Sequence, residues 1–368
     1  MPKLDDPQAL ERCDPGGMLR VLEGFPEQCE RALELGWEFP LPPELAEFDR
    51  LAVVGMGGSG IVGDLLRRLL PLPVTVHRGY VVNVDAPSLG RTLVIGVSYS
   101  GNTEETLSAL RGLQGQSRGQ SQSQSQSQRQ GEVKVLCLSS DGELERLASE
   151  RGWPFLKIPG GLQPRAALGY LLLPLLAILA RLGHFPAGEL EGLAGELERA
   201  AEGLSPERPT EANRAKQLAE WLSGGVPLIW GVEGTTDVAA FRWKTQINEN
   251  SKQPAFWNAL PELCHNEIVG FERRGRLPGQ RVLFLTSSYD HPRNRLRQRV
   301  LKELLEEWEV PTEVVASPIE GSKLAELLGL IYLGDFVSVY LGILNGVDPT
   351  PVELIERFKR MIRDSQWA

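Results

Sequence analysis

The sequence predicts an α/β fold made of two units, each with a mainly parallel β-sheet between layers of helices. Three observations predict it: short apolar runs recur along the 368 residues, helical patterns separate them, and a glycine-rich stretch of the first half has a counterpart in the second. Strands buried on both faces of a parallel sheet read as continuous apolar runs. Their alternation with helices favours parallel sheets covered on both faces.

The individual elements follow from these runs. The expected strands are Leu51–Val54, Thr92–Val97, Val133–Leu138, Val226–Trp230, Arg281–Leu285 and Thr312–Ala316. The expected helices include Ile61–Leu70, one that begins near Thr103, one that begins at Asp141, and Asp237–Asn250. The apolar segments Leu168–Leu182 and Leu324–Leu344 are expected to be buried helices. The first is too short to span a bilayer, and Glu326 and Asp335 interrupt the second.

A weak internal repeat indicates how the chain is divided. Val53–Gly60 and Ile229–Thr236 both pass from an apolar strand through a glycine turn and hydroxyl residues into a helix. We therefore expect a helical segment at 1–50, a first domain at 51–203, a second domain at 213–345 and a C-terminal segment at 346–368. The Pro- and Glu-rich stretch between the domains is the expected linker.

Residues 114–131 consist almost wholly of Gln, Ser, Gly and Arg. Such a segment cannot bury enough apolar surface to offset the entropy lost on ordering. We expect a disordered surface insertion with no chemical role.

Composition excludes several classes of protein. The formal charge of −9 and the pI near 5.3 argue against a nucleic-acid partner. The four scattered cysteines suit neither zinc pairs nor a disulfide framework, so a reducing cytoplasm is expected. No membrane span and no metal-ligand spacing is visible, and we expect no metal and no cofactor.

The stretch Gly55–Gly60, GMGGSG, joins a predicted strand to a helix. Glycines allow a close approach to backbone amides, and the start of a helix attracts anions. The spacing departs from the dinucleotide fingerprint G-x-G-x-x-G. A tight turn that serves only helix–strand packing is the structural alternative.

A second candidate anion loop, Ser98–Glu105, reads SYSGNTEE. Its hydroxyls and glycine can offer side-chain and amide donors to a phosphate. The structural alternative is a capping box in which Asn102 caps the helix and Glu105 closes the box. Both interpretations can hold at once, since the hydroxyls of Ser98, Ser100 and Thr103 then stay available.

Together these two loops resemble the sugar isomerase (SIS) domain. The later stretches Asn248–Lys252 (NENSK), Pro261–Glu267 (PELCHNE) and Gly346–Pro351 (GVDPTP) narrow the resemblance to the bifunctional phosphoglucose/phosphomannose isomerases, which carry two SIS domains. The resemblance covers the chain from Leu51 to Lys359 apart from the insertion.

The resemblance implies a reaction and an assembly. The reaction is the reversible isomerisation of glucose-6-phosphate, and of mannose-6-phosphate, to fructose-6-phosphate through a cis-enediol, without a metal. The assembly is a homodimer with the active site at the subunit interface. The resemblance also implies that the phosphate is held by Gly57, Gly58, Ser59, Ser98, Ser100 and Thr103.

Glu249 is the candidate base. It lies near the end of the predicted helix Asp237–Asn250, where partial burial and the negative end of the helix dipole strengthen a carboxylate as a base. A lone glutamate there is more often a solvated surface residue. The resemblance of its NEN motif implies that Glu249 moves the proton between C2 and C1.

Three further side chains take roles by the same resemblance. His265 helps to open the sugar ring and comes from the neighbouring subunit, although a lone histidine is more often structural. Arg165 stabilises the enediolate oxygen, although an ion pair at a helix entrance is its plain alternative. Lys359 acts beside His265, although it also reads as one more charge on a terminal helix.

Thr350 is a tentative fifth member of the catalytic set. The family threonine that permits turnover of mannose-6-phosphate is expected about two turns before the lysine, where Val352 stands. Either the loop shifts or the mannose activity is weaker.

The second unit carries Ser287–Pro292 (SSYDHP) where the first has SYSGNT. Its Asp290 is expected to repel a phosphate dianion, so we expect one sugar-phosphate site per subunit.

Other functions remain as alternatives. A non-catalytic SIS regulator that binds a sugar phosphate needs only the phosphate loop. An amidotransferase-type sugar synthase needs a nucleophilic cysteine at the N-terminus, and Cys13 is not there. A zinc-dependent isomerase needs clustered histidines and carboxylates.

Overall fold

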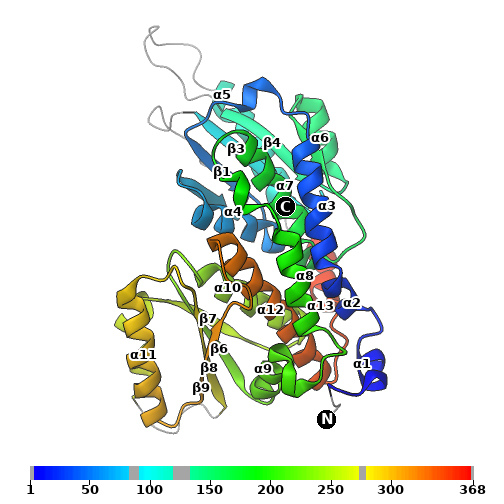
Figure 1. Cartoon of the computed structure of the whole chain (residues 1–368). Helices are drawn as coiled ribbons and strands as arrows, with labels where there is room; N and C mark the ends of the chain where they lie inside the picture. Colours follow the sequence, from blue (N-terminus) through cyan, green and yellow to red (C-terminus); the bar gives the residue numbers. More distant parts are fainter. Residues whose placement is uncertain (1–3, 83–90, 119–132, 273–278, 366–368) are drawn as a thin grey trace. The chain divides into compact units, whose positions relative to one another are not determined.

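A computed structural model describes residues 4–82, 91–118, 133–272 and 279–365 of the chain (Figure 1). The chain divides into two compact units. The front unit is Gly24–Glu196, and the rear unit combines Met1–Glu23 with Leu197–Ala368.

The front unit is built on a parallel sheet. Its elements in chain order are α3 (Phe25–Glu38), η1 (Pro43–Leu45), β1 (Arg50–Val54), α4 (Gly57–Leu69), β2 (Val74–His77), β3 (Thr92–Val97), α5 (Glu104–Arg118), β4 (Val133–Ser139), α6 (Glu143–Arg151), β5 (Phe155–Lys157), η3 (Pro164–Ala166), α7 (Leu168–Arg181), η4 (Ala187–Glu189) and the start of α8 (Leu193–Leu204). The strand order is β2-β1-β3-β4-β5, and each pairing is parallel.

The central positions of β1 and β3 in this sheet explain why their sequences are apolar. Val53 of β1 pairs with Val76 on one side and with Ile95 on the other. Since neighbouring strands cover both edges of β1 and helices flank the sheet (Figure 1), nearly every side chain of β1 and β3 is buried. The carboxyl ends of β1 and β3 therefore lie side by side, and both candidate anion loops begin there.

The rear unit repeats this plan. Its elements are α1 (Pro7–Cys13), α2 (Met18–Glu23), the rest of α8, η5 (Thr210–Ala212), α9 (Arg214–Leu222), β6 (Val226–Val232), α10 (Asp237–Asn250), β7 (Phe256–Leu260), η6 (Glu262–His265), η7 (Glu267–Phe271), β8 (Gln280–Thr286), α11 (Pro292–Glu307), β9 (Thr312–Ala316), α12 (Lys323–Leu344) and α13 (Glu353–Asp364). The strand order is β7-β6-β8-β9, again with parallel pairings. The α/β class with two parallel sheets is thus confirmed.

The central helix of the rear unit is α12. By its length and composition alone this helix is apolar enough to cross a membrane, yet its most apolar 18-residue stretch is wholly buried inside the protein. Its one buried aspartate, Asp335, forms an ion pair of 2.7 Å with Arg242 of α10. The expectation of a buried helix at Leu324–Leu344 is confirmed.

The observed division differs from the expected boundaries in two places. Residues up to Glu23 belong to the rear unit, where the hydroxyl of Tyr332 donates to the carbonyl of Leu22 (2.7 Å). Along the sequence, the boundary from the front unit to the rear unit falls within α8, before the expected linker. The expected insertion at 114–131 begins inside α5, and its remainder lies outside the described residues.

Candidate functional site

The glycine turn of the front unit is the first turn of a helix. α4 begins at Gly57, four residues before the sequence-based expectation, and Met56 precedes it in extended conformation. Gly57 has φ +50°, a region in which glycine is at no disadvantage. The residues Gly57, Gly58 and Ser59 therefore present the amide end of a helix, which attracts anions.

The second loop follows β3 and is joined to the first through hydrogen bonds. The amide of Tyr99 donates to Oγ of Ser59 (3.2 Å), and Oγ of Ser98 lies 2.9 Å from Oγ1 of Thr103. Ser98 is fully buried, whereas Ser100 is exposed and Thr103 is half-buried. Ser98 thus orients Thr103, and Ser100 and Thr103 are the hydroxyls at the surface of the loop.

The capping box that was the structural alternative for this loop is not the role of Asn102. Oδ1 of Asn102 accepts from the amide of Glu143 (3.1 Å), so Asn102 caps the start of α6 and not its own helix. Asn102 is free to do so because α5 begins at Glu104, two residues further on. Gly101 makes this contact possible: it has φ +67°, and a Cβ there would overlap the carbonyl oxygen of Asp141. The loop after β3 is thereby fixed against the loop after β4.

Tyr99 joins this loop to the segment that carries Arg165, a role that the sequence analysis missed. Its hydroxyl accepts from the amide of Leu162 (3.0 Å), and its carbonyl accepts from Oγ of Ser140 (2.7 Å). Tyr99 is 5% exposed, and this burial raises the pKa of its phenol. The available signal was its position between the two serines of SYSG.

Arg165 lies in η3, a single turn before the apolar helix α7, and its side chain is buried. Gln28 of α3 holds this turn, since its Nε2 donates to the carbonyl of Ala166 (3.0 Å) and its Oε1 accepts from the amide of Tyr170 (3.3 Å). A Cβ on Gly58 would lie 3.0 Å from the carbonyl oxygen of Pro164 and 3.5 Å from Cα of Arg165. Arg165 is therefore a neighbour of the candidate phosphate loop.

Glu249 is the last residue but one of α10, whose bounds Asp237–Asn250 match the expectation. Its side chain is half-buried. The buried face of α10 contacts α12 through Arg242, Gln246 and Asn250, which pair with Asp335 and Ser338. Glu249 is therefore carried at the end of a helix that a polar network fixes in place.

His265 lies in η6, directly after β7, and is exposed. Glu267, two residues later, anchors this region because its carboxylate accepts from Nε1 of Trp230 (2.9 Å) and from Nδ2 of Asn258. The PELCHNE motif thus holds one histidine on a well-anchored turn at the surface of the rear unit.

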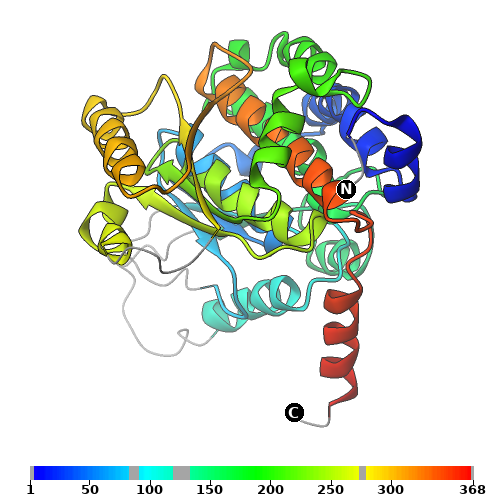
Figure 2. The same cartoon turned by 90° about the horizontal axis from the view of Figure 1, so that it is seen from below.

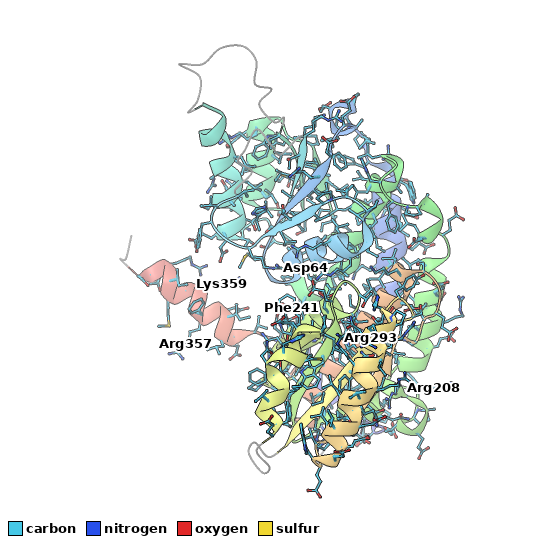
Figure 3. The ribbon with its side chains drawn as sticks, turned by 90° about the vertical axis from the view of Figure 1, so that its left-hand side faces the viewer. Asp64, Arg208, Phe241, Arg293, Arg357 and Lys359 are labelled. Carbon is cyan, nitrogen blue, oxygen red and sulfur yellow. The ribbon has the colours of Figure 1, made fainter. Side chains whose placement is uncertain are left out.

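Lys359 lies on α13, which extends away from the rest of the rear unit (Figures 2 and 3). Each residue of α13 is exposed. Thr350 precedes this helix, with its amide bonded to Oδ1 of Asp348 (2.9 Å), and Val352 is the residue that caps α13. The side chain of Thr350 packs against Gly16, where a Cβ would overlap the threonine hydroxyl. The structure therefore places Thr350 beside the N-terminal segment and Lys359 on a helix that stands out from its unit.

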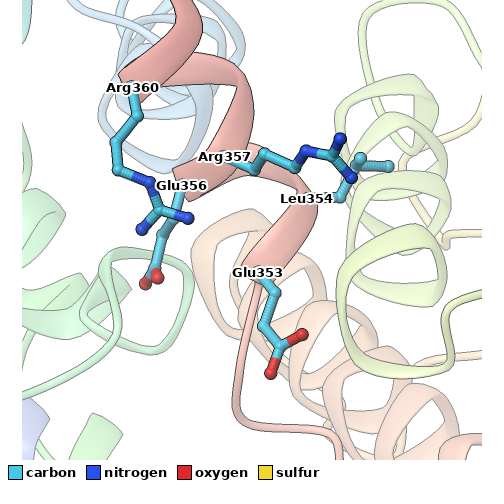
Figure 4. Close-up of a pocket in the computed structure, with 5 residues that line it drawn as sticks. All are labelled: Glu353, Leu354, Glu356, Arg357 and Arg360. Atoms are coloured by element: carbon cyan, nitrogen blue, oxygen red, sulfur yellow. The ribbon is translucent and has the colours of Figure 1, made fainter.

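A surface hollow of about 440 Å³ runs along α13 (Figure 4). It is lined by Glu353, Leu354, Glu356, Arg357 and Arg360. Among the described residues no three His, Cys, Asp or Glu side chains gather as metal ligands do.

In the rear unit, the loop Ser287–Pro292 corresponds to the phosphate loop, and two carboxylates accept hydrogen bonds from its donors. Asp290, which is 2% exposed, accepts from the amide of Ser287 (2.9 Å) and from the hydroxyl of Thr235. Glu326 of α12 accepts from Oγ of Ser287 (2.5 Å) and from the amide of Ser288 (3.0 Å). The sequence-based expectation was that Asp290 repels an incoming phosphate. In the structure Asp290 is buried instead, and the two carboxylates already use donors of this loop.

Comparisons with known proteins identify relatives over almost the whole chain. The family model described as the bacterial phospho-glucose isomerase C-terminal SIS domain matches residues 211–362. A bifunctional phosphoglucose/phosphomannose isomerase of Caldicellulosiruptor bescii is 38% identical, over 94% of this chain and 99% of the relative. One from Aquifex aeolicus is 34% identical, over 94% and 98%.

Solved structures agree at the level of the fold. A glucose-6-phosphate isomerase-like protein from Thermus thermophilus superposes with a TM-score of 0.61 and 18% identity, over 96% of this chain and 100% of its own. The curated relatives are similar to this chain along almost their whole length. This chain belongs to the family of bifunctional phosphoglucose/phosphomannose isomerases.

Proposed function

We propose that this protein is an aldose–ketose isomerase that interconverts glucose-6-phosphate and fructose-6-phosphate, and that it also accepts mannose-6-phosphate. One observation carries the proposal: the chain combines the glycine-rich start of α4, which attracts anions, with a half-buried glutamate fixed at the end of α10. Both lie in sequence motifs of the family, and the relatives named above are isomerases of these sugars.

The phosphate has its ligands in the front unit. The amides of Gly57 and Gly58 and the hydroxyls of Ser59, Ser100 and Thr103 bind the dianion, and the hydroxyl of Ser98 orients that of Thr103. Each hydrogen bond to a charged phosphate contributes about 1.5–3 kcal/mol.

Glu249 transfers the proton. Its carboxylate removes the proton from C2 of the open-chain aldose, and the electron pair forms the C1–C2 double bond of a cis-enediolate. A proton then passes from the hydroxyl on C2 to the oxygen on C1, and the same carboxyl returns its proton to C1, which gives the ketose. Arg165 stabilises the oxygen that becomes negative in this step.

Ring opening precedes this step. His265 and Lys359 serve it by moving a proton to and from the ring oxygen and hydroxyl. Glucose and mannose differ only at C2, which becomes planar in the enediolate, so one base can serve both sugars. Thr350 permits turnover of mannose-6-phosphate if the loop shifts, whereas Val352 in that place makes the mannose activity weaker.

A coupled assay in heavy water tests the reaction. We expect wild-type protein to form glucose-6-phosphate from fructose-6-phosphate with deuterium at C2, because the base exchanges its proton with solvent. A hydride shift leaves C2 without deuterium and contradicts the enediol route. Saturable binding of fructose-6-phosphate without turnover favours the competing function, a non-catalytic SIS regulator.

We propose further that the protein is a homodimer in which His265 serves the site of the neighbouring subunit. The exposed His265 supports this, as does α13, whose apolar side chains Leu354, Phe358 and Met361 are 80%, 61% and 60% exposed. Contiguous exposed apolar side chains mark interaction surfaces. The four cysteines are free thiols, which supports a cytoplasmic location.

Mixing two inactive variants tests this arrangement. E249Q and H265N subunits are unfolded together and refolded as a mixture. If His265 is supplied by the neighbour, each mixed dimer has one intact site, so about a quarter of wild-type activity returns. If His265 acts within its own chain, no activity returns and the shared site is refuted.

A further inference from the structure

Lys252 has a backbone conformation that its residue type disfavours. It follows Ser251, the C-terminal cap of α10, and has φ +54°. Glycine or asparagine commonly takes this place after a helix, because a Cβ is strained there. Among the described non-glycine residues only Lys252 and Glu309 have positive φ. A lysine at such a position indicates that its side chain has a use.

The ammonium group of Lys252 joins two parts of the rear unit. Nζ donates to the carbonyl of Glu249 (2.5 Å) and to the carbonyl of Pro349 (3.0 Å). The first carbonyl belongs to the candidate base. The second belongs to the segment that contains Thr350 and leads into α13, the helix of Lys359. One side chain therefore links the end of α10 to the start of the C-terminal segment.

The end of α10 is held without Lys252. Nδ2 of Asn250 donates to Oγ of Ser338 (2.9 Å), Oγ of Ser251 donates to the carbonyl of Ser338 (2.6 Å), and Nδ2 of Asn345 donates to the carbonyl of Ser251 (3.0 Å). These contacts to α12 and the residue after it fix the helix end. What Lys252 adds is the attachment of the C-terminal segment.

We propose that Lys252 is a positioning residue that holds the Pro349–Val352 segment at the end of α10, so that groups of the C-terminal segment keep their place relative to Glu249. The inference rests on the proposed role of Glu249. A cation suits this task, since it offers three donors and is favoured at the negative end of a helix. The competing interpretation is a surface lysine that interacts only with the helix end.

Three substitutions separate these interpretations. K252M removes the donors and keeps most of the aliphatic stem. K252G removes the donors and also the backbone strain, so its stability is not reduced by the φ value. K252R keeps a cation that can reach two carbonyls. K302M, at a partly exposed lysine on α11, is the matched control.

The readouts are kcat and KM for fructose-6-phosphate, the thermal midpoint, and amide hydrogen exchange of the non-proline residues of 348–352. We expect K252M and K252G to lose about tenfold or more in kcat, with KM within about threefold because the phosphate ligands are elsewhere. We expect K252R to regain at least about a third of the wild-type kcat, and exchange at 348–352 to become faster in K252M and K252G.

Wild-type kcat in K252M and K252G overturns the proposal, whatever the thermal midpoint, and so does a K252R variant that is no better than K252M. E249Q is measured in parallel. If E249Q keeps full turnover, the assignment of the base fails; if E249Q is inactive while K252G is fully active, only the role of Lys252 fails.

Discussion

The hydroxyl oxygen of Ser59 accepts a hydrogen bond of 3.2 Å from the amide of Tyr99, and this bond joins the first turn of α4 to the loop after β3. The two candidate phosphate loops are therefore one hydrogen-bonded unit although forty residues separate them in sequence.

Replacing Ser59 by alanine removes a proposed phosphate ligand together with the link to Tyr99. We expect S59A to raise KM for fructose-6-phosphate by about tenfold or more, with a smaller effect on kcat, because a charge-assisted bond to phosphate is lost. Steady-state kinetics measure both constants. S149A, at an exposed serine of α6, is the control. An unchanged KM in S59A contradicts the phosphate role.

Tyr99 holds the segment that leads to Arg165 through its hydroxyl. We expect Y99F to lower the free energy of unfolding by about 1 kcal/mol, since the amide of Leu162 loses its partner. We also expect a lower kcat, because Arg165 loses part of its support. Urea unfolding and initial rates give the two values, with the exposed Tyr80→Phe as control. A Y99F protein identical to wild type in both would show that the hydroxyl has no such role.

Gly101 has no room for a side chain. We expect G101A to cost about 3 kcal/mol or more, because the new methyl group collides with the backbone at Asp141. Gly112 gives a matched control: it lies in α5 and a Cβ there meets nothing within 4 Å, so G112A is expected to stabilise the helix by up to about 1 kcal/mol. Thermal unfolding of both variants tests the pair, and equal stabilities refute the close approach of the loops.

Asp290 gives the stability a defined pH dependence. Burial raises the pKa of its carboxyl above the usual value of 3.8, although bonds from Thr235 and Ser287 act against the rise. A carboxyl with a higher pKa in the folded chain binds its proton more tightly there, so it favours folding below that pKa and this contribution is lost as the pH rises through it.

The comparison with D290N isolates this effect. We expect the free energy of unfolding of wild type, relative to D290N, to fall between about pH 4 and about pH 6. Urea titrations at both pH values measure it, with D364N on the exposed α13 as control. A difference between wild type and D290N that is the same at both pH values is inconsistent with a buried, titrating carboxyl.

The parts of the fold that could be predicted are those in which the residues of a single strand or helix show a clear apolar pattern. The runs Leu51–Val54 and Thr92–Val97 are apolar throughout because they are central strands, and they appear as β1 and β3. The edge strand β7 was missed, since its Phe256 and Trp257 are exposed and no continuous apolar run marks it.

The parts that could not be predicted depend on contacts between distant residues. Asn102 has the sequence of a local cap, but its partner is Glu143 across the loop. Glu326 reads as an interruption of an apolar helix, yet its carboxylate fills the loop at Ser287 and Ser288. No periodicity within one element encodes such pairs. Glu249, by contrast, could be proposed from the sequence because both the helix end and the NEN motif are local.

The most direct measurement of the central claim is the turnover of E249Q beside its binding of fructose-6-phosphate, with E220Q, at an exposed glutamate of α9, as control. Since a positioned base contributes about 10²–10⁴ in rate, kcat of E249Q should fall by that factor while the dissociation constant stays within about threefold and E220Q keeps wild-type activity. Near-full turnover by E249Q would contradict the account.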